Sequence, residues 1–138
     1  MINKLKELKN TLQVGDYICV IALADSLYTS RERGVKPLLE LLSSGTDVHG
    51  NYAADKVVGK AAAFIYAKLG ISALYALVVS VPALEVLKRA GITVIYDELS
   101  EAIRNRRGDG FCPMESAVME ISDYDEAIAV LRERVAAM

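Results

Sequence analysis

The chain has 138 residues, a net charge of −2 and 53% hydrophobic residues. This length fits a single domain, residues 1–138, with a large core. The weakly acidic balance argues against a nucleic-acid surface, and no apolar run reaches the ~18 residues that a membrane span needs. Because the start of the chain lacks an apolar signal-peptide core, we expect a cytoplasmic protein without a structural disulfide.

The first part of the chain predicts a helix followed by a hairpin. Apolar residues recur at helical spacing from 2 to 12, which predicts a helix in the N-terminal segment 1–14. Residues 17–23 predict a strand, Asp25-Ser26 a turn, and 27–30 the returning strand. A charged loop then leads to a short helix over 37–42.

The middle of the chain alternates between helix and strand. Residues 53–69 predict the longest helix, rich in small residues in its first half and ended by Gly70. A nearly all-apolar strand over 74–79, a helix over 82–90 and a strand over 92–96 follow.

The last part of the chain predicts three helices, one around 98–104, one from Pro113 and one within 122–138. Ser122 and Asp125 resemble a capping box for the last of them. The full order is α-β-β-α-α-β-α-β-α-α-α. A hairpin followed by this alternation predicts an α/β fold, a three-layer α/β/α sandwich with a mixed sheet.

The segment from Asn105 to Glu115 brings unlike functional groups together on a Gly-rich stretch. Pro113 suits the first turn of a helix, so Cys112 lies at its cap, where the helix dipole favours thiolate. Cys112 is therefore a candidate nucleophile, or a small buried cap residue. Glu115 is a candidate acid or base, or a capping-box carboxylate. Asn105 can bind a base edge or a carbonyl, or serve the turn.

The run 77–86, followed by Ala90-Gly91-Ile92 and a strand, resembles cytidine-deaminase-like folds. Those enzymes carry two cysteines where this chain has Ala83 and Val86, and a His-x-Glu motif where it has Ala54-Asp55-Lys56. Zinc deaminases need these ligands to activate water. The resemblance therefore implies the fold without the zinc chemistry, and we predict neither a metal nor another cofactor.

Four stretches together resemble a bacterial family of unknown function that is placed by fold among the deaminase-like domains and lacks the zinc signature. The resemblance covers roughly residues 16–120. The stretches are Pro37-Leu38-Leu39, residues 54–63, Asn105-Arg106 and Cys112-Pro113-Met114-Glu115.

In the deaminase-like arrangement, the start of the helix at Asp55 lies at the ancestral active site. Lys56 and Lys60 are four residues apart and share a helix face, so they can hold an anion beside the helix amino terminus. The alternative is that both lysines extend into solvent. Asp55 is a candidate proton carrier, or a helix cap.

These residues support two main hypotheses. The first is a zinc-independent or degenerate enzyme for a small anionic, nucleotide-like ligand, which Lys56, Lys60, Asn105 and Arg106 bind. Asp55 and Glu115 then handle protons and Cys112 supplies the thiol.

The alternative is a non-catalytic ligand-sensing or dimeric interaction domain, which the missing zinc ligands and the apolar composition favour; we expect a homodimer. Nucleic-acid binding has only two arginine clusters, 31/33 and 104–107, in its support.

Overall fold

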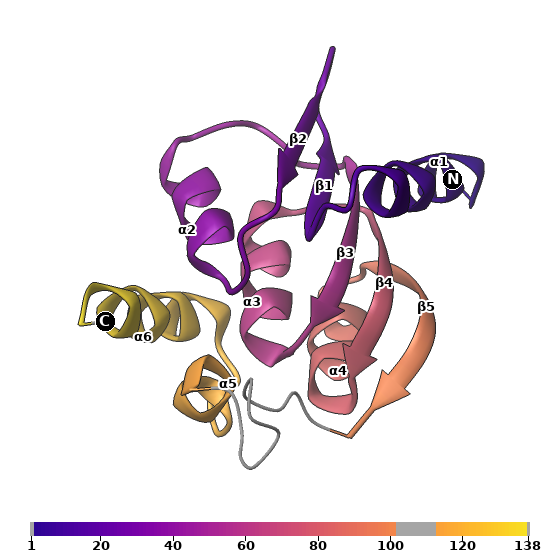
Figure 1. The fold of residues 1–138 in the computed structure, drawn as a ribbon. Helices are drawn as coiled ribbons and strands as arrows, with labels where there is room; N and C mark the ends of the chain where they lie inside the picture. Colours follow the sequence, from indigo (N-terminus) through magenta and orange to yellow (C-terminus); the bar gives the residue numbers. More distant parts are fainter. Residues whose placement is uncertain (1, 102–112, 138) are drawn as a thin grey trace.

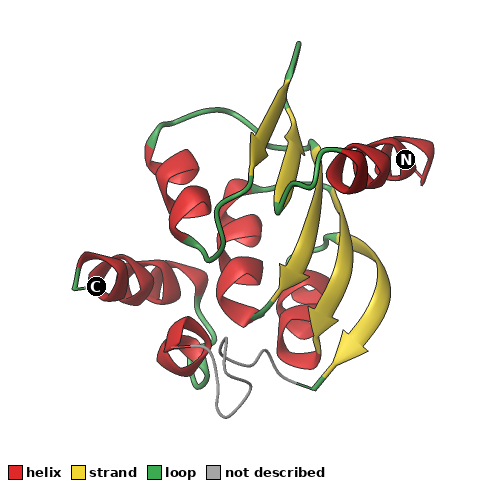
Figure 2. Ribbon diagram, in the orientation of Figure 1, coloured by secondary structure: helices red, strands yellow, loops and turns green. Residues whose placement is uncertain are grey.

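The computed structural model describes residues 2–101 and 113–137 (Figure 1). Helices and strands alternate along these residues, and the strands join in one five-stranded sheet (Figure 2). In chain order the elements are α1 (Ile2–Val14), β1 (Cys19–Ala22), β2 (Leu27–Ser30), α2 (Lys36–Ser43), β3 (Tyr52–Val58), α3 (Lys60–Leu69), β4 (Ala73–Ser80), α4 (Val81–Arg89), β5 (Thr93–Ser100), α5 (Pro113–Val118) and α6 (Tyr124–Ala136).

The sheet is mixed, as the sequence predicts, with strand order β2-β1-β3-β4-β5. β1 runs antiparallel to both β2 and β3, whereas β3, β4 and β5 are parallel. The two crossover helices α3 and α4 pack against each other on one face of the sheet. A right-handed connection from each parallel strand to the next places both helices on that same face. The carboxyl ends of β3, β4 and β5 therefore meet at one edge, at the bottom of Figure 1.

Each face of the sheet has its own core. On one face, Leu5, Leu8 and Leu12 of α1 are 1–2% exposed and pack against residues such as Val20 and Tyr75. This confirms the predicted apolar side of the first helix, except that Ile2 is 55% exposed. The opposite face is covered by α3 and α4, and α2, α5 and α6 pack against α3.

Several predicted elements are confirmed with small shifts at their ends. The backbone N–H of Leu23 donates to Ser26, which closes the hairpin turn predicted at Asp25-Ser26, and β2 has the predicted bounds. Helices begin close to Pro37 and Pro82, and the apolar strand extends over Ala73–Ser80.

The predicted helix over 53–69 is wrong in its first part. Residues 52–58 form β3, which pairs with β1 on one side and β4 on the other. Ala53 and Ala54 are both 0% exposed, so their small side chains fit a central strand that is covered on both faces. The helix α3 begins only after Gly59, and the observed order is α-β-β-α-β-α-β-α-β-α-α.

Two predictions near the end of the chain also need correction. Residues 98–100 extend β5, where Glu98 pairs with Val78 of β4, and do not begin a helix. Glu101 forms a bend, and residues 102–104 of that predicted helix lie outside the described residues. The cap of α6 is Asp123, whose carboxylate accepts from the N–H of Glu126, rather than Ser122.

Among residues 2–101 and 113–137, no helix combines the length and apolar character needed to cross a bilayer.

Candidate functional site at the carboxyl edge of the parallel strands

Two helices begin at the edge where the parallel strands end. α3 starts directly after β3, with Gly59 as its cap, and α4 starts directly after β4, with Ser80 as its cap. The Ser80 hydroxyl accepts from the N–H of Ala83 at 3.2 Å, whereas Gly59 has no side chain to cap its helix. The first N–H groups of α3 therefore need a partner from elsewhere in the chain.

Glu115 of α5 supplies that partner. Its Oε1 accepts from the N–H of Lys60 and its Oε2 from the N–H of Ala61, both at 2.7 Å. The carboxyl group is half-buried. Burial raises the pKa of Glu115, while the two N–H groups and the Lys60 ammonium act in the opposite direction. The amino terminus of α3 thus holds an anion in a two-pronged contact, with helix dipole and N–H groups both favouring the charge.

Gly59 leaves room for this contact. A Cβ built on Gly59 would overlap the carboxyl group of Glu115, so a larger residue displaces that side chain. The glycine adopts an extended conformation that any residue can take, with φ of −94°. The glycine is therefore required for the space that it leaves to the Glu115 carboxylate, and not for its backbone conformation.

Lys60 reinforces the contact between α3 and α5. Its Nζ donates to the carbonyl oxygen of Met119 at 2.7 Å and lies 5.7 Å from the ring centre of Phe64. Lys60 and Glu115, both predicted site residues, are therefore brought together across 55 residues of sequence.

Asp55 lies away from this edge, inside the core on the α3 side of the sheet. It is 4% exposed, and its Oδ2 accepts from the Tyr66 hydroxyl at 2.6 Å. Tyr66 also lies 3.1 Å from the Cys19 sulfur. Burial raises the pKa of Asp55 to about 7, against the opposing effect of its hydrogen bonds. The helix-cap alternative for Asp55 is wrong, because the residue lies within β3.

Lys56 follows Asp55 in the same strand and so points to the opposite face. Its Nζ lies 3.0 Å from a carboxylate oxygen of Asp16, in the turn after α1. The prediction that Lys56 and Lys60 share a helix face is wrong, since Lys56 is in a strand and Lys60 begins the helix that follows.

The remaining predicted site residues, Asn105, Arg106 and Cys112, lie outside the described residues. Cys19 is 5% exposed, as its apolar neighbours in the sequence predict. Within the two described ranges, no group of His, Cys, Asp and Glu side chains could hold a metal ion.

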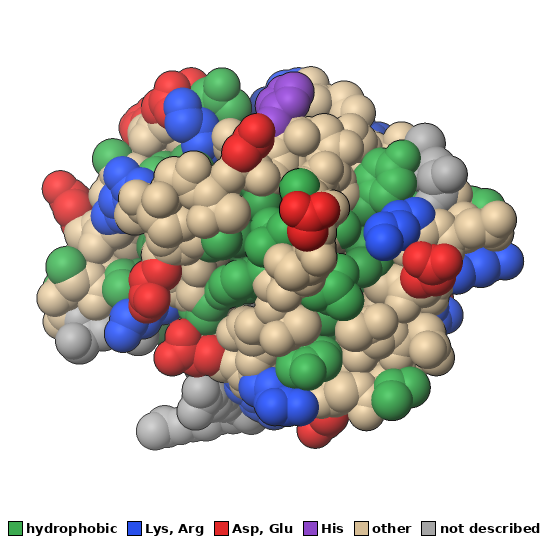
Figure 3. Space-filling model, turned by 90° about the horizontal axis from the view of Figure 1, so that it is seen from above, with side chains coloured by type: hydrophobic (Ala, Val, Ile, Leu, Met, Phe, Trp, Pro, Cys, Tyr) green, Lys and Arg blue, Asp and Glu red, His purple; other side chains and the backbone are tan. Residues whose placement is uncertain are grey.

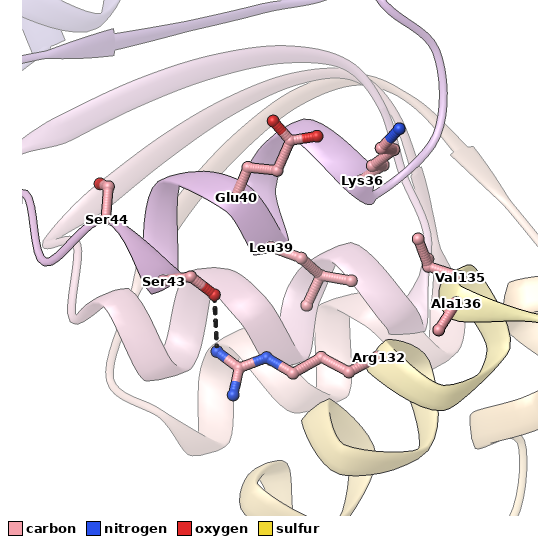
Figure 4. A pocket seen from close by; sticks show the side chains of 8 residues that line it. All are labelled: Lys36, Leu39, Glu40, Ser43, Ser44, Arg132, Val135 and Ala136. Atoms are coloured by element: carbon pink, nitrogen blue, oxygen red, sulfur yellow. Dashed lines mark hydrogen bonds between the residues drawn. The ribbon is translucent and has the colours of Figure 1, made fainter.

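A second surface feature lies between α2 and α6, and residues of these two helices line it. It is an open groove with a volume of about 500 Å³ and an apolar base formed by Leu39, Val135 and Ala136 (Figure 4). One end is crossed by Arg132, whose guanidinium donates to the Ser43 hydroxyl at 3.2 Å. The sequence analysis did not identify this groove, and none of the predicted site residues lines it.

The end of the molecule opposite to the carboxyl edge carries charges of both signs (Figure 3). Acidic and basic side chains are interspersed there around exposed hydrophobic ones. The described residues on this face thus present no continuous basic surface to a nucleic-acid backbone.

Residues 7–135 match the sequence model of a family described as "TM1506: Domain of unknown function (DUF1893)". The chain belongs to the DUF1893 family. A crystal structure of the DUF1893 protein TM1506 from Thermotoga maritima is similar over 96% of this chain and 90% of the other, with 30% identity and a TM-score of 0.89. A search of curated proteins gives no match. The predicted membership of a family of unknown function is thereby confirmed.

The sequence analysis of this DUF1893 chain missed several residues that contact the predicted ones, above all Gly59 and Tyr66. Gly59 follows two β-branched residues, Val57 and Val58, and precedes a run of small helix-forming residues. That pattern is typical of a strand, a tight turn and a helix, and could have revealed the amino terminus of α3. Nothing in the sequence links Tyr66 to Cys19.

Proposed function

We propose that this DUF1893 chain binds a small anionic ligand at the carboxyl edge of its parallel strands, where α3 begins. The observation that carries the proposal is the Glu115 carboxylate on the N–H groups of Lys60 and Ala61. Those N–H groups are already arranged to receive two oxygens of one anion. A phosphate or carboxylate of a ligand would take the same position once Glu115 moves away.

The topology of the sheet supports this location. Ligands of open α/β sheets bind outside the carboxyl ends of the strands, where loops and helix amino termini meet. Here the amino termini of α3 and α4 both lie at that edge. Lys60 adds a cationic side chain next to the Glu115 carboxyl group.

The proposal extends to the segment between β5 and α5. β5 ends at the same edge, and α5 contributes Glu115 to it. In this proposal, Asn105 and Arg106 bind the ligand and Cys112 supplies a reactive thiol. The ligand is nucleotide-like, and the fold is a three-layer α/β/α sandwich of the cytidine-deaminase kind. The roles of Cys112, Asn105 and Arg106 derive from their residue types in this segment, and the nucleotide-like ligand and the fold derive from the resemblance in sequence.

The enzyme version and the non-catalytic version of the proposal need different residues. Asp55, the proposed proton carrier, is sealed in the core against Tyr66, and Lys56 forms an ion pair with Asp16 on the other face. In this conformation both side chains are therefore engaged with groups other than the amino terminus of α3. The non-catalytic, ligand-sensing alternative needs only Lys60, the α3 N–H groups and a displaceable Glu115.

Binding can be tested by titrating inorganic phosphate and a nucleoside 5′-monophosphate while recording the amide NMR signals of Lys60 and Ala61. We expect Glu115→Gln to bind either anion about tenfold more tightly than the wild type, because a neutral amide competes less well for the N–H groups. Glu120→Gln is the matched control, since Glu120 is an exposed glutamate five residues after Glu115, and this variant should bind either anion as the wild type does. Chloride at equal ionic strength controls for salt. If both anions leave the Lys60 and Ala61 signals unchanged in Glu115→Gln, the proposal is wrong.

Whether the chain also catalyses a reaction is a separate question, and the reactivity of the Cys112 thiol distinguishes the enzyme version from the non-catalytic version. The alkylation rate of Cys112 can be measured against pH with the buried Cys19 as an internal control that reacts only on unfolding. Fast alkylation near neutral pH, with protection by a bound anion, supports the enzyme version. A Cys112 that reacts only on unfolding leaves the non-catalytic version.

A further inference from the structure

Three polar side chains meet inside the apolar core between β1, β3 and α3. Cys19 of β1 is 5% exposed, Asp55 of β3 is 4% exposed and Tyr66 of α3 is 0% exposed. Each comes from a different element, and Cys19 and Asp55 are direct partners in the antiparallel register of β1 and β3. The anion site proposed above uses none of the three.

The three groups form one hydrogen-bonded chain. The Tyr66 oxygen lies 2.6 Å from Asp55 Oδ2 and 3.1 Å from the Cys19 sulfur. Asp55 Oδ1 accepts from the N–H of Val57 at 3.3 Å. When Asp55 is ionised, Cys19 can donate to Tyr66 and Tyr66 to Asp55. When Asp55 is protonated on Oδ2, the same chain can run in reverse, so that every group keeps a partner in both states.

No cation offsets the charge of an ionised Asp55 within the described part of the chain. From β1 the titratable neighbour is Cys19, from α3 it is Tyr66, and from β2 it is Tyr28, which lies on the far side of Cys19. β4 faces Asp55 with Ala76. The adjacent Lys56 pairs with Asp16 on the opposite face of the sheet. A carboxylate buried this deeply without a cation is costly, even with good hydrogen bonds.

We propose that the Cys19–Tyr66–Asp55 chain is a proton-linked element that makes the packing of α3 on β1 and β3 depend on pH. In mildly acidic solution Asp55 holds a proton, and the three elements are joined by a neutral chain of hydrogen bonds. In neutral to alkaline solution the proton leaves, and an uncompensated charge remains in the core beneath α3.

The direction of the pH dependence follows from the two states of Asp55. In the unfolded chain this carboxyl titrates near its usual value of 3.8, whereas burial raises its pKa in the folded chain to about 7. Between these values the folded state binds a proton that the unfolded state does not. The contribution of Asp55 to stability is therefore greatest below pH 3.8, declines up to about pH 7 and is constant above it.

Urea unfolding from pH 4 to pH 8 tests this proposal in the wild type and in Asp55→Asn. We expect the unfolding equilibrium constant of the wild type to rise by up to about 10³-fold relative to the variant over this range. Asp97→Asn is the matched control, because Asp97 also accepts from a tyrosine, Tyr75, at 2.7 Å but is exposed and paired with Lys9. That variant retains the pH dependence that Asp55 causes. Equal pH profiles for the wild type and Asp55→Asn overturn the proposal.

The infrared spectrum of the wild type provides a test that does not depend on a variant. At pH 6 the exposed carboxyl groups are ionised, so we expect a band to which the protonated Asp55 carboxyl group contributes and which disappears as the pH is raised through neutrality. Its absence at pH 6 shows that Asp55 is ionised and overturns the proposal.

Discussion

Asp55 and Glu115 both contact helix α3, but the groups that surround them are different. Glu115 is half-buried and accepts from two backbone N–H groups at the start of the helix, close to the Lys60 ammonium. Asp55 is buried in the core, where it accepts a short hydrogen bond from the Tyr66 hydroxyl and a longer one from the N–H of Val57. From the sequence, both were candidates for proton transfer or for capping a helix. Burial raises the pKa of both carboxyl groups, but at Glu115 the helix N–H groups and Lys60 oppose this effect, whereas Asp55 has no cation beside it among the described residues and its pKa rises to about 7.

Tyr66→Phe gives the largest effect on the buried side of this comparison. The variant removes the hydroxyl that lowers the pKa of Asp55, so the decline of stability with pH extends above about pH 7. We expect a loss of about 1–3 kcal/mol at pH 8 because the Asp55 carboxyl loses its shortest hydrogen bond. The loss should be smaller at pH 4, where Asp55 is neutral. Urea unfolding at both pH values measures it, and a loss that is larger at pH 4 contradicts the account.

Glu115→Ala tests the exposed side. It leaves the N–H groups of Lys60 and Ala61 without their partner and removes the two hydrogen bonds that Glu115 makes between α5 and α3. We expect a loss of about 1–2 kcal/mol, the usual range for removing a helix cap. Glu120→Ala, in an exposed position, serves as control and should change stability by less than about 0.5 kcal/mol. Equal effects of the two variants in thermal or urea unfolding would show that Glu115 does not act as a cap.

Gly59→Ala sharpens the same point. The new methyl group displaces the Glu115 carboxyl group, so we expect a loss of about 1 kcal/mol in the wild-type background. In the Glu115→Ala background the contact is already missing, and the methyl group should cost nothing. A double-mutant cycle measures this difference, and additive effects would contradict a shared contact.

Lys56→Gln should have the smallest effect. The ion pair between Lys56 and Asp16 is at the surface, where such pairs contribute about 0–1 kcal/mol and often less than 0.5. We expect neither anion binding nor the pH profile to change. Loss of phosphate binding in Lys56→Gln would return Lys56 to the ligand site, against the placement on the opposite face.

The sequence predicts those elements whose local pattern agrees with their surroundings. The hairpin around Asp25-Ser26, the apolar strand at 73–80 and the helices near Pro37 and Pro82 all have such patterns. It fails at residues 53–58, where small residues suited to a helix form a central strand. Pairing with β1 and β4 and burial of both faces outweigh local propensity there.

The candidate site is less predictable than the fold because its contacts join residues far apart in the chain. One interpretation of Glu115 was a capping-box carboxylate of its own helix, but the helix whose N–H groups it accepts from begins 55 residues earlier. The lysine pair was expected on one face because a single helix was assumed, and the strand separates Lys56 from Lys60. Asp55 and Tyr66 likewise come from different elements, so no periodicity in the sequence connects them.

The most direct measurement is a titration of the side-chain carboxyl carbons of Asp55 and Glu115 by NMR in the wild type, with Asp55→Asn and Glu115→Gln to assign the two signals. The account predicts that Asp55 titrates near pH 7, at a higher pH than Glu115, because only Glu115 has a helix amino terminus and a lysine beside it. The reverse order, or an Asp55 that titrates with the exposed carboxyl groups, would contradict the distinction between the two sites.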